Sequence, residues 1–138
     1  MKVLVDTPVW SLALRRRTGV QAVQAEVGEL GALIDDGRVA MIGPIRQELL
    51  SGIRDADGFQ RLREHLRAFD DVPIETGDFE RAAEHFNTCR RRGVQGSNTD
   101  FLICAVAERL EAPILTTDRD FSRYADLLPI VLHGRTSG

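Results

Sequence analysis

The sequence has little cysteine, histidine and lysine, and each shortage excludes a kind of site. Two cysteines are present, Cys89 and Cys104, and they fall in separate helical patterns without a close-spaced partner. This placement favours buried, reduced thiols over a disulfide or zinc framework. The three histidines, His65, His85 and His133, are scattered along the chain. Zinc and thiol redox chemistry are therefore not expected.

Long hydrophobic runs are also missing. No apolar run approaches the roughly 20 residues that a helix needs to span a bilayer. The chain enters a strand-like pattern at Lys2, without the charged and then apolar leader of a secreted protein. We therefore expect a cytoplasmic protein that does not contact a membrane. With 138 residues, 43% of them hydrophobic, the chain suits one core, so residues 1–138 are expected to form a single domain.

The charge gives no overall attraction to nucleic acid, because the net charge is −3. The basic residues are unevenly distributed, and Lys2 is the only lysine. Each of two arginine clusters lies where a helix is expected to end, shortly before Gly19 or Gly93, and cations there complement the helix macrodipole. Because the guanidinium fork also suits phosphate, RNA contact stays open as the less favoured alternative. The clusters are Arg15, Arg16 and Arg17, and Arg90, Arg91 and Arg92.

Short apolar runs alternate with longer amphipathic stretches. Such alternation predicts an α/β fold with a mainly parallel sheet covered by helices. Asp57 and Asp78 could cap the fourth and fifth helices, and Ser97 or Asn98 the sixth. The predicted strands are Lys2–Val5, Val39–Ile42, Val72–Ile74, Ile114–Thr116 and Ile130–Leu132. The predicted helices are Val9–Arg17, Val20–Asp35, Ile45–Ile53, Asp57–Phe69, Phe79–Arg92 and Thr99–Leu110.

Four carboxylates fall where this fold would bring them together. Asp6 and Asp118 each follow a predicted strand, and ligands of parallel sheets bind beyond the carboxyl ends of strands. Asp100 lies in the first turn of a predicted helix, where the macrodipole favours an anion. Glu48 lies beside the apolar stripe of its helix. Because repelling acids converge mainly when a cation holds them, the combination predicts a divalent-metal site for phosphate chemistry.

Each acid alone has a simpler interpretation. Asp6 could merely end a strand, Glu48 could be a solvated helix residue, Asp100 a helix-start charge, and Asp118 a turn residue. These interpretations do not require all four to face one rim, so we favour a shared site. Carboxylate oxygens suit Mg²⁺ or Mn²⁺, and no cluster of histidine and cysteine supports zinc.

The segments around the acids resemble the PIN-domain nucleases, and most closely the VapC-type toxins of bacterial toxin–antitoxin pairs. They are V-L-V-D-T-P-V-W around Asp6, P-I-R-Q-E-L-L-S-G around Glu48, and T-D-F-L-I-C-A-V-A-E-R-L-E-A-P-I-L-T-T-D-R-D-F from Thr99 to Phe121. They occur in the family's order, and the last is the most specific. The resemblance implies a three-layer α/β/α sandwich. It also implies that Mg²⁺ or Mn²⁺ is bound by an acidic quartet of Asp6, Glu48, Asp100 and Asp118.

The same resemblance makes Asp120 a possible auxiliary acid. Thr7 or Thr117 could orient a carboxylate by a hydrogen bond, although either could equally be a plain turn hydroxyl. Pro8 departs from the family, which commonly has a small polar residue there, and proline has no hydrogen-bond donor.

For function, the resemblance implies endonucleolytic hydrolysis of RNA that leaves a 5′-phosphate and a 3′-hydroxyl. It implies a cognate VapB-type antitoxin, a segment of which would lie in a groove of the toxin. It also implies a homodimer, and the apolar residues of Val9–Arg17 or Val20–Asp35 could supply a partner surface or simply face the sheet.

Two alternatives belong to other classes. One is a PIN-domain nuclease that processes RNA without an antitoxin. The other is a Mg²⁺-dependent phosphotransfer module. The second is disfavoured because Lys2 opens the first strand at the end opposite to such a site, and Pro8 stands where a dehalogenase-type phosphatase would need a second Asp.

Overall fold

The computed structural model describes residues 1–15 and 25–134, and its centre is a parallel sheet. The strands are β1 (Val3–Val5), β2 (Val39–Ala40) and β3 (Ile114–Leu115), in the order β2-β1-β3. Leu4 pairs with Ala40 on one side and with Ile114 on the other. All of β1 is buried, as expected for the central strand of a parallel sheet covered on both faces.

The two outer predicted strands are reduced to single bridges. Met41 bridges to Asp71 beside β2, and Ile114 bridges to Leu132 beyond β3. The prediction of regular strands at Val72–Ile74 and Ile130–Leu132 is therefore wrong. Pro73 explains the first, because proline has no N–H to donate to a ladder. The second run lies at the sheet edge and leaves Val131 exposed.

The described residues form seven helices, one more than predicted. The added helix is α7, which is only eight residues long and buries only Phe121 and Tyr124. Two buried positions are too few to show a helical repeat in the sequence. Of the predicted helix Val20–Asp35, residues 20–24 lie outside the described residues. The helices are α1 (Thr7–Arg15), α2 (Ala25–Asp35), α3 (Gly43–Leu50), α4 (Ala56–Leu66), α5 (Thr76–Arg91), α6 (Asn98–Leu110) and α7 (Asp120–Leu127).

Three helix starts test the predicted caps. Ser97 caps α6, where its Oγ accepts the Asp100 N–H at 3.0 Å. The cap of α4 is Asp55 rather than Asp57, with Oδ2 accepting the Gly58 N–H at 2.8 Å. Asp78 lies inside the first turn of α5, and its Oδ2 accepts an N–H at 2.9 Å from Glu75, the residue before the helix. The prediction of Asp57 as a cap is therefore wrong by two residues, whereas Asp78 does help to cap α5, as the third residue of a capping box whose N-cap residue is Glu75.

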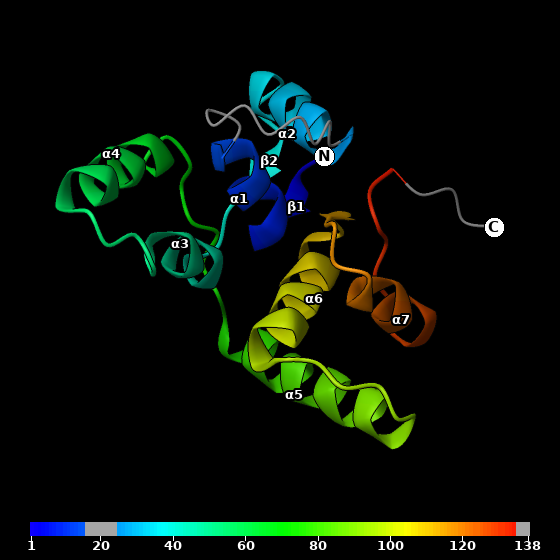
Figure 1. Cartoon of the computed structure of the whole chain (residues 1–138). Helices are drawn as coiled ribbons and strands as arrows, with labels where there is room; N and C mark the ends of the chain where they lie inside the picture. Colours follow the sequence, from blue (N-terminus) through cyan, green and yellow to red (C-terminus); the bar gives the residue numbers. More distant parts are fainter. Residues whose placement is uncertain (16–24, 135–138) are drawn as a thin grey trace.

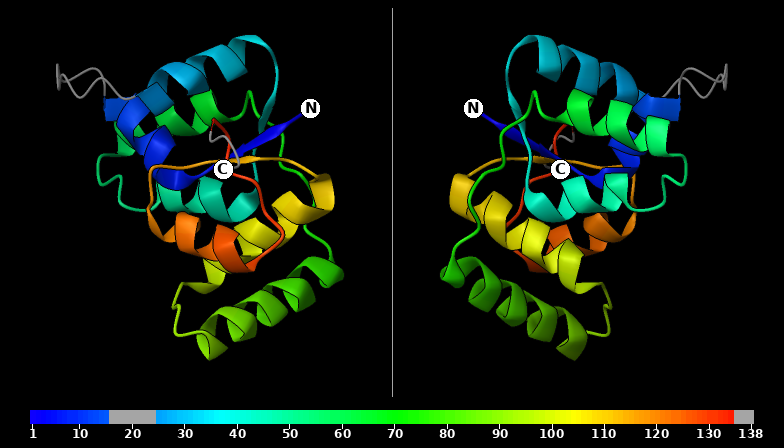
Figure 2. Two further views of the ribbon diagram at one scale, coloured as in Figure 1. Left: turned by 90° about the vertical axis from the view of Figure 1, so that its right-hand side faces the viewer. Right: turned by 90° about the vertical axis from the view of Figure 1, so that its left-hand side faces the viewer.

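The elements form three layers, as predicted. Figure 1 shows α1 and α2 on one side of the sheet and α6 and α7 on the other. The side views of Figure 2 show α5 on the outer side of α6. These two helices make the most extensive contact between any two elements of the described chain. Lying between the sheet and its neighbours, α6 is buried from Phe101 to Ala107. Within the described ranges, no helix is long and apolar enough to cross a membrane.

Candidate active site

Asp6 joins the central strand to α1. It directly follows β1, and its Oδ1 accepts the Thr7 N–H at 2.9 Å while its carbonyl accepts the Val9 N–H at 3.2 Å. The carboxylate therefore lies at the N-terminal end of α1, where backbone donors favour a negative charge. Pro8 falls in the first helical turn, where its missing N–H has no partner to lose.

Thr116 connects two of the acids. Its Oγ1 donates to Asp6 Oδ2 at 2.9 Å and accepts the Asp118 N–H at 2.9 Å. Asp118 lies two residues before α7, where its Oδ1 accepts the Asp120 N–H at 2.9 Å and its carbonyl accepts the Phe121 N–H at 3.2 Å. Asp120 is exposed, and its contact with Asp118 is made by its backbone N–H rather than by its carboxylate.

Thr7 connects Asp6 with the acid on α3. Its Oγ1 donates to Glu48 Oε1 at 2.7 Å, in addition to the N–H that it gives to Asp6. Thr7 thus makes the kind of contact that the sequence suggested for it. Within the described part of the chain, the side chain of Thr117 makes no hydrogen bond, and the neighbouring Thr116 orients the Asp6 carboxylate instead.

Asp100 is the acid of α6. Its N–H is held by the Ser97 cap, and its Oδ2 accepts a hydrogen bond of 2.7 Å from the hydroxyl of Tyr124 on α7. Tyr124 is fully buried, whereas Asp100 is half-buried. Asp100 is therefore partly in contact with solvent, while the tyrosine that donates to it belongs to the buried core.

Burial and mutual repulsion perturb the acids. Asp6 is 4% exposed, and its burial is the main reason that its pKa is raised to about 6. The hydrogen bonds from Thr116 and Thr7 lower this pKa, and the negative charges of Asp100 and Asp118 raise it. Burial, followed by the charge of Asp118, also raises the pKa of Asp100. Asp6, Asp100 and Asp118 thus lie within reach of one another's charge.

The buried thiols belong to the same surroundings. Cys89 and Cys104 are free and buried, as expected from the sequence. Burial raises the pKa of Cys104, and the charges of Asp100 and Asp6 raise it further. Cys104 is therefore a protonated part of the core beneath the acids.

The donor set fits a hard divalent cation. The quartet offers carboxylate oxygens only, and among the residues that the structure describes none of the four acids forms an ion pair with an arginine, lysine or histidine. As the side chains stand, no three metal-ligating groups of the described residues gather closely enough to hold an ion. The acids share one rim, and holding an ion would require their side chains to turn toward it.

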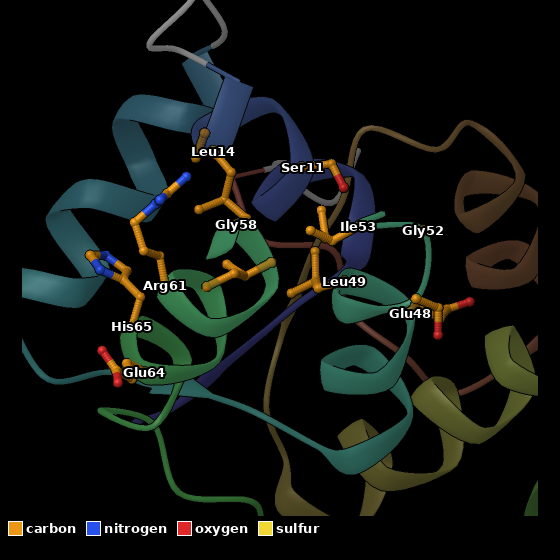
Figure 3. Close-up of a pocket in the computed structure, with 13 residues that line it drawn as sticks. Ser11, Leu14, Glu48, Leu49, Gly52, Ile53, Gly58, Arg61, Glu64 and His65 are labelled. Atoms are coloured by element: carbon orange, nitrogen blue, oxygen red, sulfur yellow. The ribbon is translucent and has the colours of Figure 1, made fainter. Parts of the chain in front are cut away.

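A groove opens next to this rim, between α1, α3 and α4. Its volume is about 930 Å³, and its apolar lining includes Leu49 and Ile53. Figure 3 shows Glu48 at one end of the groove and Arg61 and His65 toward the other. The groove and the acidic rim therefore share Glu48.

The model of the PIN domain family matches residues 3–127. The chain belongs to the PIN-domain family. Two curated relatives refine the membership: VapC ribonuclease Mb1587 of Mycobacterium bovis and Ribonuclease VapC11 of Mycobacterium tuberculosis. Each is 32% identical over 123 residues, which cover 86% of this chain and 88% of the relative. This PIN-domain protein is therefore of the VapC type.

Solved structures agree on the fold of the PIN domain. VapBC2 from Rickettsia felis, bound to a DNA fragment from its promoter, superposes with a TM-score of 0.75 at 18% identity, over 96% of this chain and 98% of that one. FitAcB from Neisseria gonorrhoeae gives a TM-score of 0.72 at 21% identity, over 95% and 96%. A toxin–antitoxin complex from Klebsiella pneumoniae gives 0.62 at 21% identity, over 88% and 91%.

Two residues that touch the acids of this PIN domain, Thr116 and Tyr124, are not predicted from the sequence. The signal for Thr116 was present, because it opens the pattern T-x-D-x-D-F, but the threonine adjacent to Asp118 was chosen instead. No local signal marks Tyr124, which lies in the helix that sequence analysis did not predict.

The arginine clusters lie where helices end. Arg90 and Arg91 close α5, Arg92 follows, and all three are exposed before Gly93 at φ 76°. The other cluster begins at Arg15, the last residue of α1, and Arg16 and Arg17 lie outside the described residues. The helix-end placement of the described cluster agrees with the prediction, and contact with RNA stays a prediction.

Proposed function

We propose that this VapC-type protein is a Mg²⁺- or Mn²⁺-dependent endoribonuclease that acts as the toxin of a toxin–antitoxin pair. The observation that carries the proposal is the acidic rim, where Asp6, Asp100 and Asp118 interact electrostatically and meet no cation among the described residues. The ribonuclease names of the relatives at 32% identity support the choice of RNA as substrate.

In this proposal Asp6, Glu48, Asp100 and Asp118 hold the ion, and Asp120 is an auxiliary acid at the rim. The bound ion would lower the pKa of a coordinated water and offset the charge on the attacked phosphate. In the hydrolysis a water molecule would give up a proton to solvent, its oxygen would form a bond to phosphorus, and the bond to the 3′-oxygen would break. The products are a 5′-phosphate and a 3′-hydroxyl, which takes up a proton.

The chain's own residues orient the carboxylates. Thr116 fixes Asp6 relative to Asp118, and Thr7 fixes Asp6 relative to Glu48. Each such hydrogen bond removes a rotational freedom that would otherwise be lost when the ion binds. The exposed Arg90, Arg91 and Arg92, together with the cluster that begins at Arg15, would contact phosphates of the RNA.

The partner in this proposal is a VapB-type antitoxin, since relatives of the fold were solved as VapBC2 and as a toxin–antitoxin complex. The groove between α1, α3 and α4 is the surface that suits a partly apolar antitoxin segment, because Leu49 and Ile53 line it. A segment in that groove would reach Glu48 and could present a basic side chain to the acids. The homodimer and the cytoplasmic location stay predictions.

The test is cleavage of RNA by the purified protein in Mg²⁺, in Mn²⁺ and in EDTA, with the 5′ ends sequenced. Asp100→Asn should lose activity by orders of magnitude, while Asp35→Asn, an exposed carboxylate at the end of α2, should cleave like the wild type. A folded Asp100→Asn protein with full Mg²⁺-dependent activity would overturn the assignment.

A second experiment separates the toxin from an RNA-processing nuclease. Expression of the wild-type chain should arrest growth, and co-expression of a small gene encoded directly upstream should restore it. Unimpaired growth with active, soluble protein would favour the processing nuclease.

A further inference from the structure

We infer that Tyr124 is a positioning residue, which holds the Asp100 carboxylate in its working orientation, and that Gly96 is required because it leaves room for the Tyr124 ring. The inference rests on the proposed function, because it assigns a task to Tyr124 within that site. Neither residue belongs to the acidic quartet. Both act through Asp100.

The contact is short and protected from solvent. The Tyr124 hydroxyl donates to Asp100 Oδ2 at 2.7 Å, and Tyr124 is 0% exposed. Water therefore does not compete for the hydroxyl, and a hydrogen bond from a neutral donor to a carboxylate is among the stronger kinds. Because Tyr124 lies on α7 and Asp100 lies in the first turn of α6, the bond ties these two helices together.

The direction of the hydroxyl is set by the packing of the ring. Tyr124 lies against Phe101 at 4.9 Å between ring centroids and against Phe121 at 5.1 Å. Phe101 is in turn held by Phe86 of α5, at 5.6 Å. A ring in contact with aromatic neighbours from two helices has little freedom to turn, so the hydroxyl is aimed at Asp100 before any ion arrives.

Gly96 is a glycine for reasons of space. A Cβ added there would collide with the Tyr124 hydroxyl oxygen, and would lie 2.8 Å from Tyr124 Cζ and 2.9 Å from Phe101 Cζ. Its φ is not among the positive values of the described chain, so backbone conformation does not demand glycine. Any other residue at position 96 must push the Tyr124 ring away from Asp100.

A purely structural role for the Tyr124 hydroxyl would give different results when the hydroxyl is removed. If Tyr124 only satisfies a buried polar group, removing its hydroxyl lowers thermal stability and leaves metal affinity and turnover unchanged. If it positions Asp100, metal affinity and kcat fall while the KM for RNA holds, because RNA is bound by other surfaces. Metal binding and the split between kcat and KM therefore separate the two roles.

The experiment measures Mn²⁺ binding by calorimetry and single-substrate RNA cleavage for the full chain. Tyr124→Phe removes one oxygen and keeps the ring, and we expect Mn²⁺ affinity and kcat each to fall by about 10–100-fold. The KM should change less than about twofold, since the substrate contacts are kept. The matched control is Phe69→Leu, which loosens a separate aromatic contact, with Trp10 at 5.1 Å between ring centroids, and its Mn²⁺ affinity and kcat should match the wild type.

Gly96→Ala tests the second half of the inference. It should reproduce the losses of Tyr124→Phe, and the double variant should lose less than the product of the two single losses, because both changes act on one contact. Fully multiplicative effects would show that Gly96 does not act through the Tyr124 hydroxyl.

The outcomes distinguish this inference from the proposed function. If the wild type neither binds Mn²⁺ nor cleaves RNA, the proposed function fails. If the wild type does both and Asp100→Asn does neither, the site stands, and wild-type Mn²⁺ affinity and kcat in Tyr124→Phe then overturn only the role of Tyr124. A loss of thermal stability alone in Tyr124→Phe counts against positioning in the same way.

Discussion

Replacing Asp6 with Asn should stabilise the metal-free protein at neutral pH while it abolishes cleavage. Asp6 is buried, and burial is the main reason that its pKa rises from 3.8 to about 6. The folded protein therefore holds the Asp6 proton more tightly than the unfolded chain does. Above that pH the ionised carboxylate lowers the free energy of unfolding.

The magnitude follows from the shift. About two pKa units correspond to roughly 3 kcal/mol, a penalty that is absent below the unfolded pKa of 3.8, grows through the window up to about 6 and is complete above it. Asparagine cannot ionise, but its single acceptor oxygen replaces two that meet Thr7 and Thr116. Losing one such bond costs about 1 kcal/mol, so the net gain should be about 1–2 kcal/mol at pH 7.5.

The assay is urea unfolding in EDTA, followed by circular dichroism, for the wild type, Asp6→Asn and the surface control Asp35→Asn. The stabilisation of Asp6→Asn should shrink toward zero or change sign near pH 4, whereas Asp35→Asn should follow the wild type at both pH values. Saturating Mn²⁺ should reverse the order, because an ion that binds the folded wild type raises its stability by mass action. A variant less stable than the wild type at pH 7.5 would refute the electrostatic account, and so would a difference that does not depend on pH.

Three other predictions concern the rim, the arginines and assembly. Thr116→Val removes the hydroxyl that bonds to Asp6 and Asp118, and it should lower the rate of RNA cleavage by about 10–100-fold. A thermal unfolding measurement on the same variant checks that it is folded. Changing Arg90–Arg92 to glutamine should weaken RNA binding and flatten its dependence on salt if these side chains touch phosphates, whereas an unchanged salt slope would favour the helix-end role. The purified protein should have the mass of a dimer by light scattering at micromolar concentration, and an active monomer that still binds antitoxin would contradict an obligatory dimer.

Local chemistry was enough to predict the three strands of the sheet, six of the seven described helices and the places of three acids within them. Asp6 and Asp118 stand just after apolar runs that do form β1 and β3, and Asp100 stands in the first turn of α6 behind the Ser97 cap. These features are local, because each depends on a few neighbouring residues. The predictions of regular outer strands failed for a related reason, since pairing at a sheet edge depends on partners that the local pattern does not contain.

The role of Thr116 required the register of the sheet. Val5 pairs with Leu115 in parallel, so the next residues along each strand, Asp6 and Thr116, come side by side. A shift of one residue would have brought Thr117 to Asp6 instead. A local sequence pattern does not distinguish the two adjacent threonines, whereas the register of the sheet does.

Three acids of the rim share a further property that explains how the metal-free chain tolerates them. Asp6 precedes α1, Asp100 lies in the first turn of α6, and Asp118 directly precedes the turn that opens α7. Favourable interaction with a helix N-terminus contributes about 0.3–1 kcal/mol per charge. That is less than the roughly 3 kcal/mol that the burial and neighbours of Asp6 alone impose, as judged from its pKa of about 6. The remainder is carried by the hydrophobic core around β1 and α6, so the protein can fold with its acids unpaired. A cation that neutralises the rim would then release this penalty, which links metal binding directly to the stability of the fold.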